Sequence, residues 1–108
     1  MQALLENNPI SFYKSEALKS EFEKLMERAS EAEPTLKNKI ENEIVAKGLK
    51  FVPEMIEHMQ TSKGITRGLC AMCLIRIGVS CVSFIEEASI LNNDFQWIAN
   101  YLLNEIRI

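Results

Sequence analysis

Residues 65–78 read ITRGLCAMCLIRIG, and this stretch decides the fold. A helix drawn over 65–77 carries apolar side chains on almost every side and leaves only Arg67, Arg76 and small residues for a solvated edge. A helix that is apolar all round is normally buried between other elements. Gly78 follows at the position where glycine commonly ends a helix. The stretch therefore predicts a central helix with other helices packed around it.

Helical patterns continue on both sides of this central segment. Ser15 is expected to be the N-cap of the first helix, and Pro34 and Pro53 fall in the first turns of the next two, where proline is tolerated. No segment alternates apolar and polar residues over the length of a strand, so the predicted fold class is all-α. The expected helices cover about 16–31, 34–48, 52–61, 65–77, 79–91 and 95–108.

The chain also matches itself at a spacing of about 30 residues. A shift of 30 residues lays Ile40, Ile44 and Gly48 over Cys70, Leu74 and Gly78, and a shift of 29 aligns further apolar positions. Such self-similarity is typical of solenoids, so we expect three stacked antiparallel hairpins in one domain over 1–108. A plain helical bundle with chance periodicity is the alternative. The expected divisions are an N-terminal extension over 1–14 and repeats at about 15–48, 49–78 and 79–108.

The middle repeat carries a family resemblance. Residues 51–57, FVPEMIE, resemble the first helix of a HEAT repeat, and residues 66–78 resemble the second. The Val-Pro pair, Arg67 near the start of the second helix and the Ile-Gly at its end fall where that family has them. The unit is shorter than the family's usual length of about 40 residues, and the outer repeats lack some of these residues. The resemblance implies a HEAT-like α-α superhelix that binds another protein and does no chemistry.

Composition narrows the possible partners. The net charge is −3 and no stretch clusters Lys and Arg, so we expect no nucleic-acid partner. The apolar run over 65–79 contains two arginines and is shorter than the roughly 20 residues that cross a bilayer, so we expect no membrane partner. The start of the chain lacks the basic and apolar regions of a secretory signal, which favours a cytoplasmic location.

Cys70 and Cys73 form a C-x-x-C pattern, which can indicate redox chemistry or half of a zinc site. Here the pattern falls inside the apolar helix, and no second pair follows to complete a zinc shell. Small buried core residues are the main interpretation. The alternatives are a soft metal site that recruits Cys81 or a methionine, and a redox pair.

His58 and the carboxylates give no case for an enzyme. His58 lies off the apolar stripe of its helix, and no Ser or Cys partner is implied, so we expect it to face solvent. Phosphate-binding, dinucleotide-binding and metalloprotease motifs are absent from the sequence. We therefore expect no catalytic residues and no cofactor.

The last helix indicates the binding surface. One stripe of this helix is apolar as a core requires, and a second apolar stripe lies nearly opposite to it, formed by Trp97, Tyr101 and Ile108. These residues are the expected protein-binding or oligomerisation contacts, including a homodimer contact. Alternatively, Trp97 and Tyr101 fold back onto the helix over 79–91 or onto residues 3–5.

The sequence thus predicts a non-catalytic module for protein–protein interaction. The alternative is a small acidic inhibitor of the immunity-protein type, which would bind and block a basic toxin or enzyme. Its target would meet a secondary acidic face, for which we expect Glu41, Glu43, Glu54 and Glu57.

Overall fold

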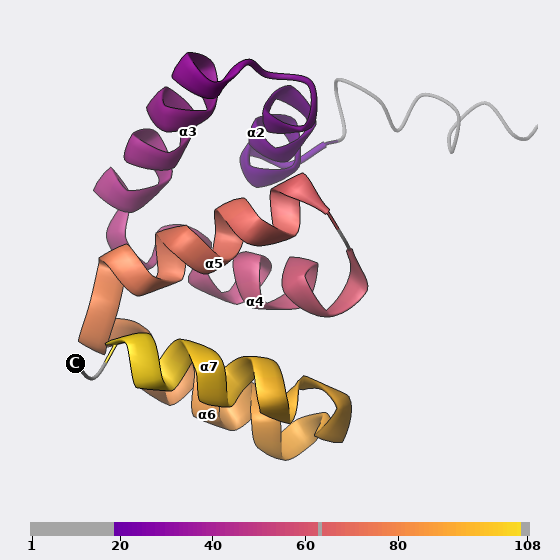
Figure 1. Cartoon of the computed structure of the whole chain (residues 1–108), viewed down its shortest axis with the longest axis vertical. Coiled ribbons are helices and arrows are strands. Elements are labelled where there is room, and N and C mark those ends of the chain that lie inside the picture. Colours follow the sequence, from indigo (N-terminus) through magenta and orange to yellow (C-terminus); the bar gives the residue numbers. More distant parts are fainter. Residues whose placement is uncertain (1–18, 63, 107–108) are drawn as a thin grey trace, which may run out of the picture.

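The computed structural model describes residues 19–62 and 64–106 of the chain (Figure 1). Within these ranges the protein consists of helices and turns without any strand, which confirms the predicted all-α fold. The α-helices are α2 (Glu21–Ser30), α3 (Pro34–Ala46), α4 (Val52–Thr61), α5 (Ile65–Ile77), α6 (Val82–Leu91) and α7 (Gln96–Ile106). Three short 3-10 helices join them, η1 (Gly48–Phe51), η2 (Gly78–Cys81) and η3 (Asn93–Phe95).

Consecutive helices pair as α2 with α3, α4 with α5 and α6 with α7. The last two pairs stack, because α4 contacts α6 and α5 contacts α7. Figure 1 shows α5 and α7 in front, running in the same direction, with α4 and α6 behind them. Helix α5 also contacts α2 and α3, so it lies at the centre of the fold.

The first helix among the described residues begins later than the sequence pattern indicates. The helix starts at Glu21 with Ser20 as its N-cap, whereas a start at 16 was expected, and Ser15 lies outside the described residues. The Ser20 hydroxyl accepts from the Glu23 N–H, and the Glu23 carboxylate accepts from the Ser20 N–H. This reciprocal pair satisfies two N–H groups at the helix start. Ser15 has Leu18 at the corresponding position, which can make no such bond.

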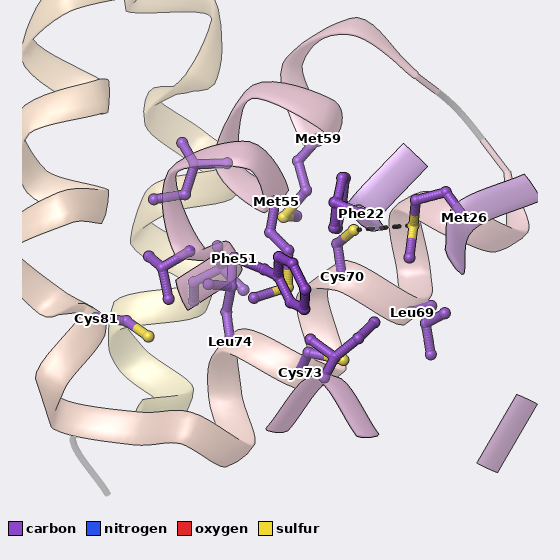
Figure 2. Close-up of a cluster of buried hydrophobic side chains, with 14 of the residues drawn as sticks. Phe22, Met26, Phe51, Met55, Met59, Leu69, Cys70, Cys73, Leu74 and Cys81 are labelled. Atoms are coloured by element: carbon purple, nitrogen blue, oxygen red, sulfur yellow. Dashed lines mark hydrogen bonds between the residues drawn. The ribbon is translucent and has the colours of Figure 1, made fainter. Parts of the chain in front are cut away.

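The buried core extends over all six α-helices, and one part of it lies where α2, α4 and α5 meet. Figure 2 shows Met26, Met55 and Met59 around Cys70, whose thiol is 3.7 Å from the Met26 sulfur. Phe22 packs against this cluster from α2. The buried side chains of the described residues are all hydrophobic. The fold is therefore stabilised by apolar burial, with α5 as the shared surface.

One edge of α5 is open to solvent, and it is more apolar than expected. Ile65 and Met72 are 54% and 48% exposed, although the sequence pattern places only arginines and small residues there. Both lie on the same helix face as Gly68 and Arg76, which are also exposed. The neighbours of α5 are α2, α3, α4 and α7, and they leave this face uncovered.

The helix expected over 79–91 begins at Val82, because residues 78–81 form η2. Ile85 is fully buried, and Glu86 and Glu87 are exposed.

The stretch Ile65–Leu91 is long and apolar enough to cross a membrane by length and composition, with a mean hydropathy of 2.0. It is longer than the run over 65–79, because α6 follows α5 with only η2 between them. A core helix of a soluble protein passes the same test. Gly78, at φ 88° and ψ −142°, ends α5 and begins η2, so that α5 and α6 are separate helices in this protein. The lack of a membrane partner stays a prediction.

Candidate functional site

Exposed large hydrophobic side chains concentrate in the C-terminal part of the fold. Among the described residues, two such side chains, Leu36 and Leu49, precede α4. The others lie between Ile65 and Tyr101, and the most exposed are Val79, Ile90, Leu91 and Trp97. Contiguous exposed apolar surface is characteristic of interaction sites, whereas scattered single residues are ordinary. An interaction site is therefore expected where several of these residues share a concave surface.

A groove between α5 and α7 brings several of them together. Its volume is about 350 Å³, and we call it the α5–α7 groove. Trp97 and Tyr101 form the α7 wall and are 71% and 52% exposed. Gly68 and Ala71 form the α5 wall. The remaining lining residues are Met59, Arg67 and Ile98.

Gly68 leaves space in this groove that the fold does not require. A Cβ atom added to Gly68 would meet nothing within 4 Å among the described residues, and its φ is not positive. Glycine in a helix costs about 0.5–1 kcal/mol relative to alanine. Neither close packing nor backbone conformation explains Gly68, so the empty α5 wall is a candidate for contact with another molecule.

Arg67 lies beside the groove and is half-buried. Its guanidinium makes no hydrogen bond or ion pair with the residues that the structure describes. A half-buried cation without a partner is a recognition group for an anion or an aromatic ring. Arg67 and Gly68 were not expected as site residues, and a glycine inside the most apolar helix was their only signal in the sequence.

The aromatic residues expected from the last helix are accessible. Trp97 and Tyr101 face the α5–α7 groove and are not covered by α6. The opposite stripe of α7 is buried as predicted, with Ala99 and Leu102 fully buried, and Phe95 of η3 just before the helix is 1% exposed. Ile108 and residues 3–5 lie outside the described residues.

The four carboxylates expected on an acidic face lie on two helices. Glu41, on α3, accepts a 2.8 Å hydrogen bond from Arg76 of α5, and Glu43 is exposed nearby in the chain. Glu54 and Glu57, on α4, line a depression of about 390 Å³ together with Glu23 of α2. Glu54 and Glu57 thus line one depression, whereas Glu41 is hydrogen-bonded to Arg76 of α5.

His58 is partly buried rather than fully solvent-facing as the sequence led us to expect. Its Nε2 lies 2.8 Å from the Thr66 hydroxyl, and its Nδ1 lies 3.2 Å from the Ser62 hydroxyl. The ring packs edge-on against Phe22 with centroids 5.8 Å apart. Partial burial lowers the pKa of His58 below its ordinary value, since desolvation disfavours the charged form. The imidazole therefore links the end of α4 to the start of α5.

Cys70, Cys73 and Cys81 are free and buried, as the main interpretation predicts. Burial raises the pKa of Cys70 and Cys73 to about 12 and that of Cys81 to about 11. The thiolate is the reactive and metal-binding form, so these cysteines are poorly suited to either role. Among the described residues, no group of three or more His, Cys, Asp or Glu side chains is arranged to hold a metal ion.

The α5–α7 groove is thus the best-supported candidate site on geometry. The chain was compared with protein-family models, with curated proteins and with solved structures, and no match was found in any of the three.

Proposed function

We propose that this chain is a non-catalytic protein-binding module and that the α5–α7 groove is its contact surface. The observation that carries the proposal is the exposure of Trp97 and Tyr101 over a wall made of Gly68 and Ala71. Tryptophan and tyrosine are enriched among the residues that dominate binding energy at interfaces. The small residues opposite them leave room for side chains of a partner.

The stacked hairpins support membership of the HEAT-like helical repeats as part of this proposal. Val52 and Pro53 open α4, Arg67 lies in the first turn of α5, and Gly78 ends α5. These are the places that the resemblance assigns to them. Repeat proteins of this kind generally bind partners through surfaces formed by equivalent helices of successive repeats, and the α5–α7 groove lies between the second helices of two successive hairpins.

Affinity capture from an extract of the source organism tests the proposal. The wild-type chain should retain a partner protein that Trp97→Ala and Tyr101→Ala each lose. Val79→Ala is the matched control, because Val79 is 74% exposed in η2 and lies outside the groove. Equal retention by all four proteins would refute the role of the groove.

The inhibitor-type alternative is favoured by a separate observation. Glu23, Glu54 and Glu57 surround a depression whose floor includes Phe22. A basic side chain of a toxin or enzyme would be attracted to such a site. Glu54→Gln with Glu57→Gln should then abolish capture, whereas Trp97→Ala should not. The same extract experiment therefore separates the two functions.

A further inference from the structure

The α5–α7 groove contains both halves of a self-complementary contact. A two-fold interface uses the same patch on both copies, so that patch must carry a projection and a matching recess. Trp97 supplies the projection, because 71% of it is exposed. Gly68 leaves room opposite it, because it lies in the wall of the groove without a side chain and an added Cβ would meet only open space.

The directions of the helices bring these two features into register. Helices α5 and α7 run in the same direction (Figure 1), and Gly68 and Trp97 both lie in the first turns of their helices. If two copies are related by a two-fold axis that runs along the groove, α7 of each copy lies over α5 of the other. Because this axis is parallel to the helices, residues at the same height along α5 and α7 then lie opposite each other. Trp97 of each copy then enters the recess at Gly68 of the other.

The charges at this end of the groove are complementary in the same arrangement. Arg67 precedes Gly68, and Asp94 lies in η3 just before α7. Neither side chain makes an ion pair with the described residues. Within one copy, Arg67 lines a depression of about 130 Å³ together with Asp94 and lines the groove together with Trp97. With α7 over α5, Arg67 of each copy would also face the indole ring of Trp97 and the carboxylate of Asp94 from the other. Cation–π attraction and opposite charges both favour that contact.

We propose that a second copy of this chain occupies the α5–α7 groove in a two-fold dimer. Trp97 fills the recess at Gly68, and Arg67 pairs with Asp94 across the interface. This inference rests on the proposed protein-binding role of the groove and names its occupant.

Analytical ultracentrifugation and tryptophan fluorescence of the purified full chain test the dimer. Trp97 is the only tryptophan in the chain, so its emission reports on this one position. We expect the dimer mass at high concentration and a shift of emission to longer wavelength on dilution, as Trp97 becomes solvated. Trp97→Ala and Gly68→Leu should each raise the dissociation constant by about tenfold or more, and Val79→Ala should leave it unchanged. Circular dichroism checks that each variant is folded. If Gly68→Leu does not fold, Gly68→Ala replaces it as the milder substitution.

A charge exchange tests the arrangement itself. Arg67→Asp and Asp94→Arg should each weaken self-association, because each places like charges opposite one another. An equimolar mixture of the two variants should associate again, because the mixed dimer restores two opposite-charge pairs. A mixture that stays monomeric, or a dimer that is insensitive to Gly68→Leu, would overturn the proposed arrangement.

The outcomes also separate this inference from the proposed function. A wild type that stays monomeric at all concentrations, with unchanged Trp97 emission, overturns the second copy as the occupant. If Trp97→Ala still abolishes capture of a different protein from the extract, the proposed function stands without the dimer. If neither assay depends on Trp97, both proposals fail.

Discussion

Gly48 and Gly78 occupy equivalent places in successive hairpins, 30 residues apart, and both have positive φ, at 63° and 88°. Each begins a 3-10 turn that leads into a helix whose first residue is valine, Val52 or Val82. Glycine adopts positive φ without steric strain, whereas residues with a Cβ rarely do. The 30-residue spacing visible in the sequence therefore coincides with a glycine-led 3-10 turn at both places, although positive φ itself also occurs at Gly64, at 85°.

Two glycine-to-alanine substitutions should change stability in opposite directions. Gly78 has φ 88° and ψ −142°, a region that is almost restricted to glycine, so Gly78→Ala should lower the free energy of unfolding by about 1–3 kcal/mol. Gly68→Ala should raise it by about 0.5–1 kcal/mol, because alanine is the better helix former and the added Cβ meets open space. Urea denaturation of both variants measures the difference.

The two variants control for each other, since the chemical change is the same and neither Cβ meets a described atom within 4 Å. Only the backbone conformation differs. Equal effects of the two substitutions would contradict this explanation.

The helices were predictable from local pattern, and their exact ends were less so. Pro34 and Pro53 mark the starts of α3 and α4 correctly, because proline excludes most other helical positions. The start of α2 was misassigned to Ser15, although Ser20 with Glu23 three residues later is the stronger capping signal. Residues 49–51 of η1 fall in the link left between the expected helices over 34–48 and 52–61, whereas residues 79–81 of η2 were assigned to the following helix because they continue its apolar pattern.

The candidate site was only half predictable. Trp97 and Tyr101 stand out from helical spacing alone, because they lie off the buried stripe of their own helix. The opposite wall depends on which helix lies beside α7, which is a tertiary relationship that no local pattern contains. The hydrogen bond between His58 and Thr66 could not be predicted from local sequence either, because the two side chains meet only after the chain reverses between α4 and α5.

The three thiols should be unreactive in the folded protein. Cys70 and Cys73 have pKa values of about 12, so almost no thiolate is present at pH 8, and burial excludes bulky reagents. A disulfide-exchange reagent should therefore label no cysteine under native conditions and all three in denaturant. Rapid labelling of the folded protein would contradict the burial of these side chains. It would favour instead the alternatives of a soft metal site or a redox pair.

The contact between Arg76 and Glu41 should contribute modestly to stability. The Arg76 guanidinium donates to Glu41 at 2.8 Å and to Asn42 at 2.9 Å, which joins α5 to α3. The Arg76 side chain is 40% exposed, so solvent screens the pair. A double-mutant cycle with Arg76→Ala and Glu41→Ala should give a coupling free energy of about 0.2–1 kcal/mol that decreases at high salt. Coupling that is absent at low salt would show that the two side chains do not interact in solution.

His58 should make the fold less stable as the pH falls below about 6.5. Partial burial lowers the pKa of His58 in the folded state, so the unfolded chain binds the proton more readily in the window between the two pKa values. Stability should therefore be full above the unfolded pKa and should be lost progressively as the pH falls through the folded one.

His58 is the only histidine, so its imidazole signal in an NMR titration is unambiguous and should give a pKa below the value measured in urea. Urea denaturation between pH 7.5 and 5.5 should show the same dependence, and His58→Gln should abolish it. Carboxyl groups ordinarily titrate near about 4.3, below this window. A folded-state pKa equal to or above that in urea would mean that Thr66 and Phe22 do not shield the ring from solvent.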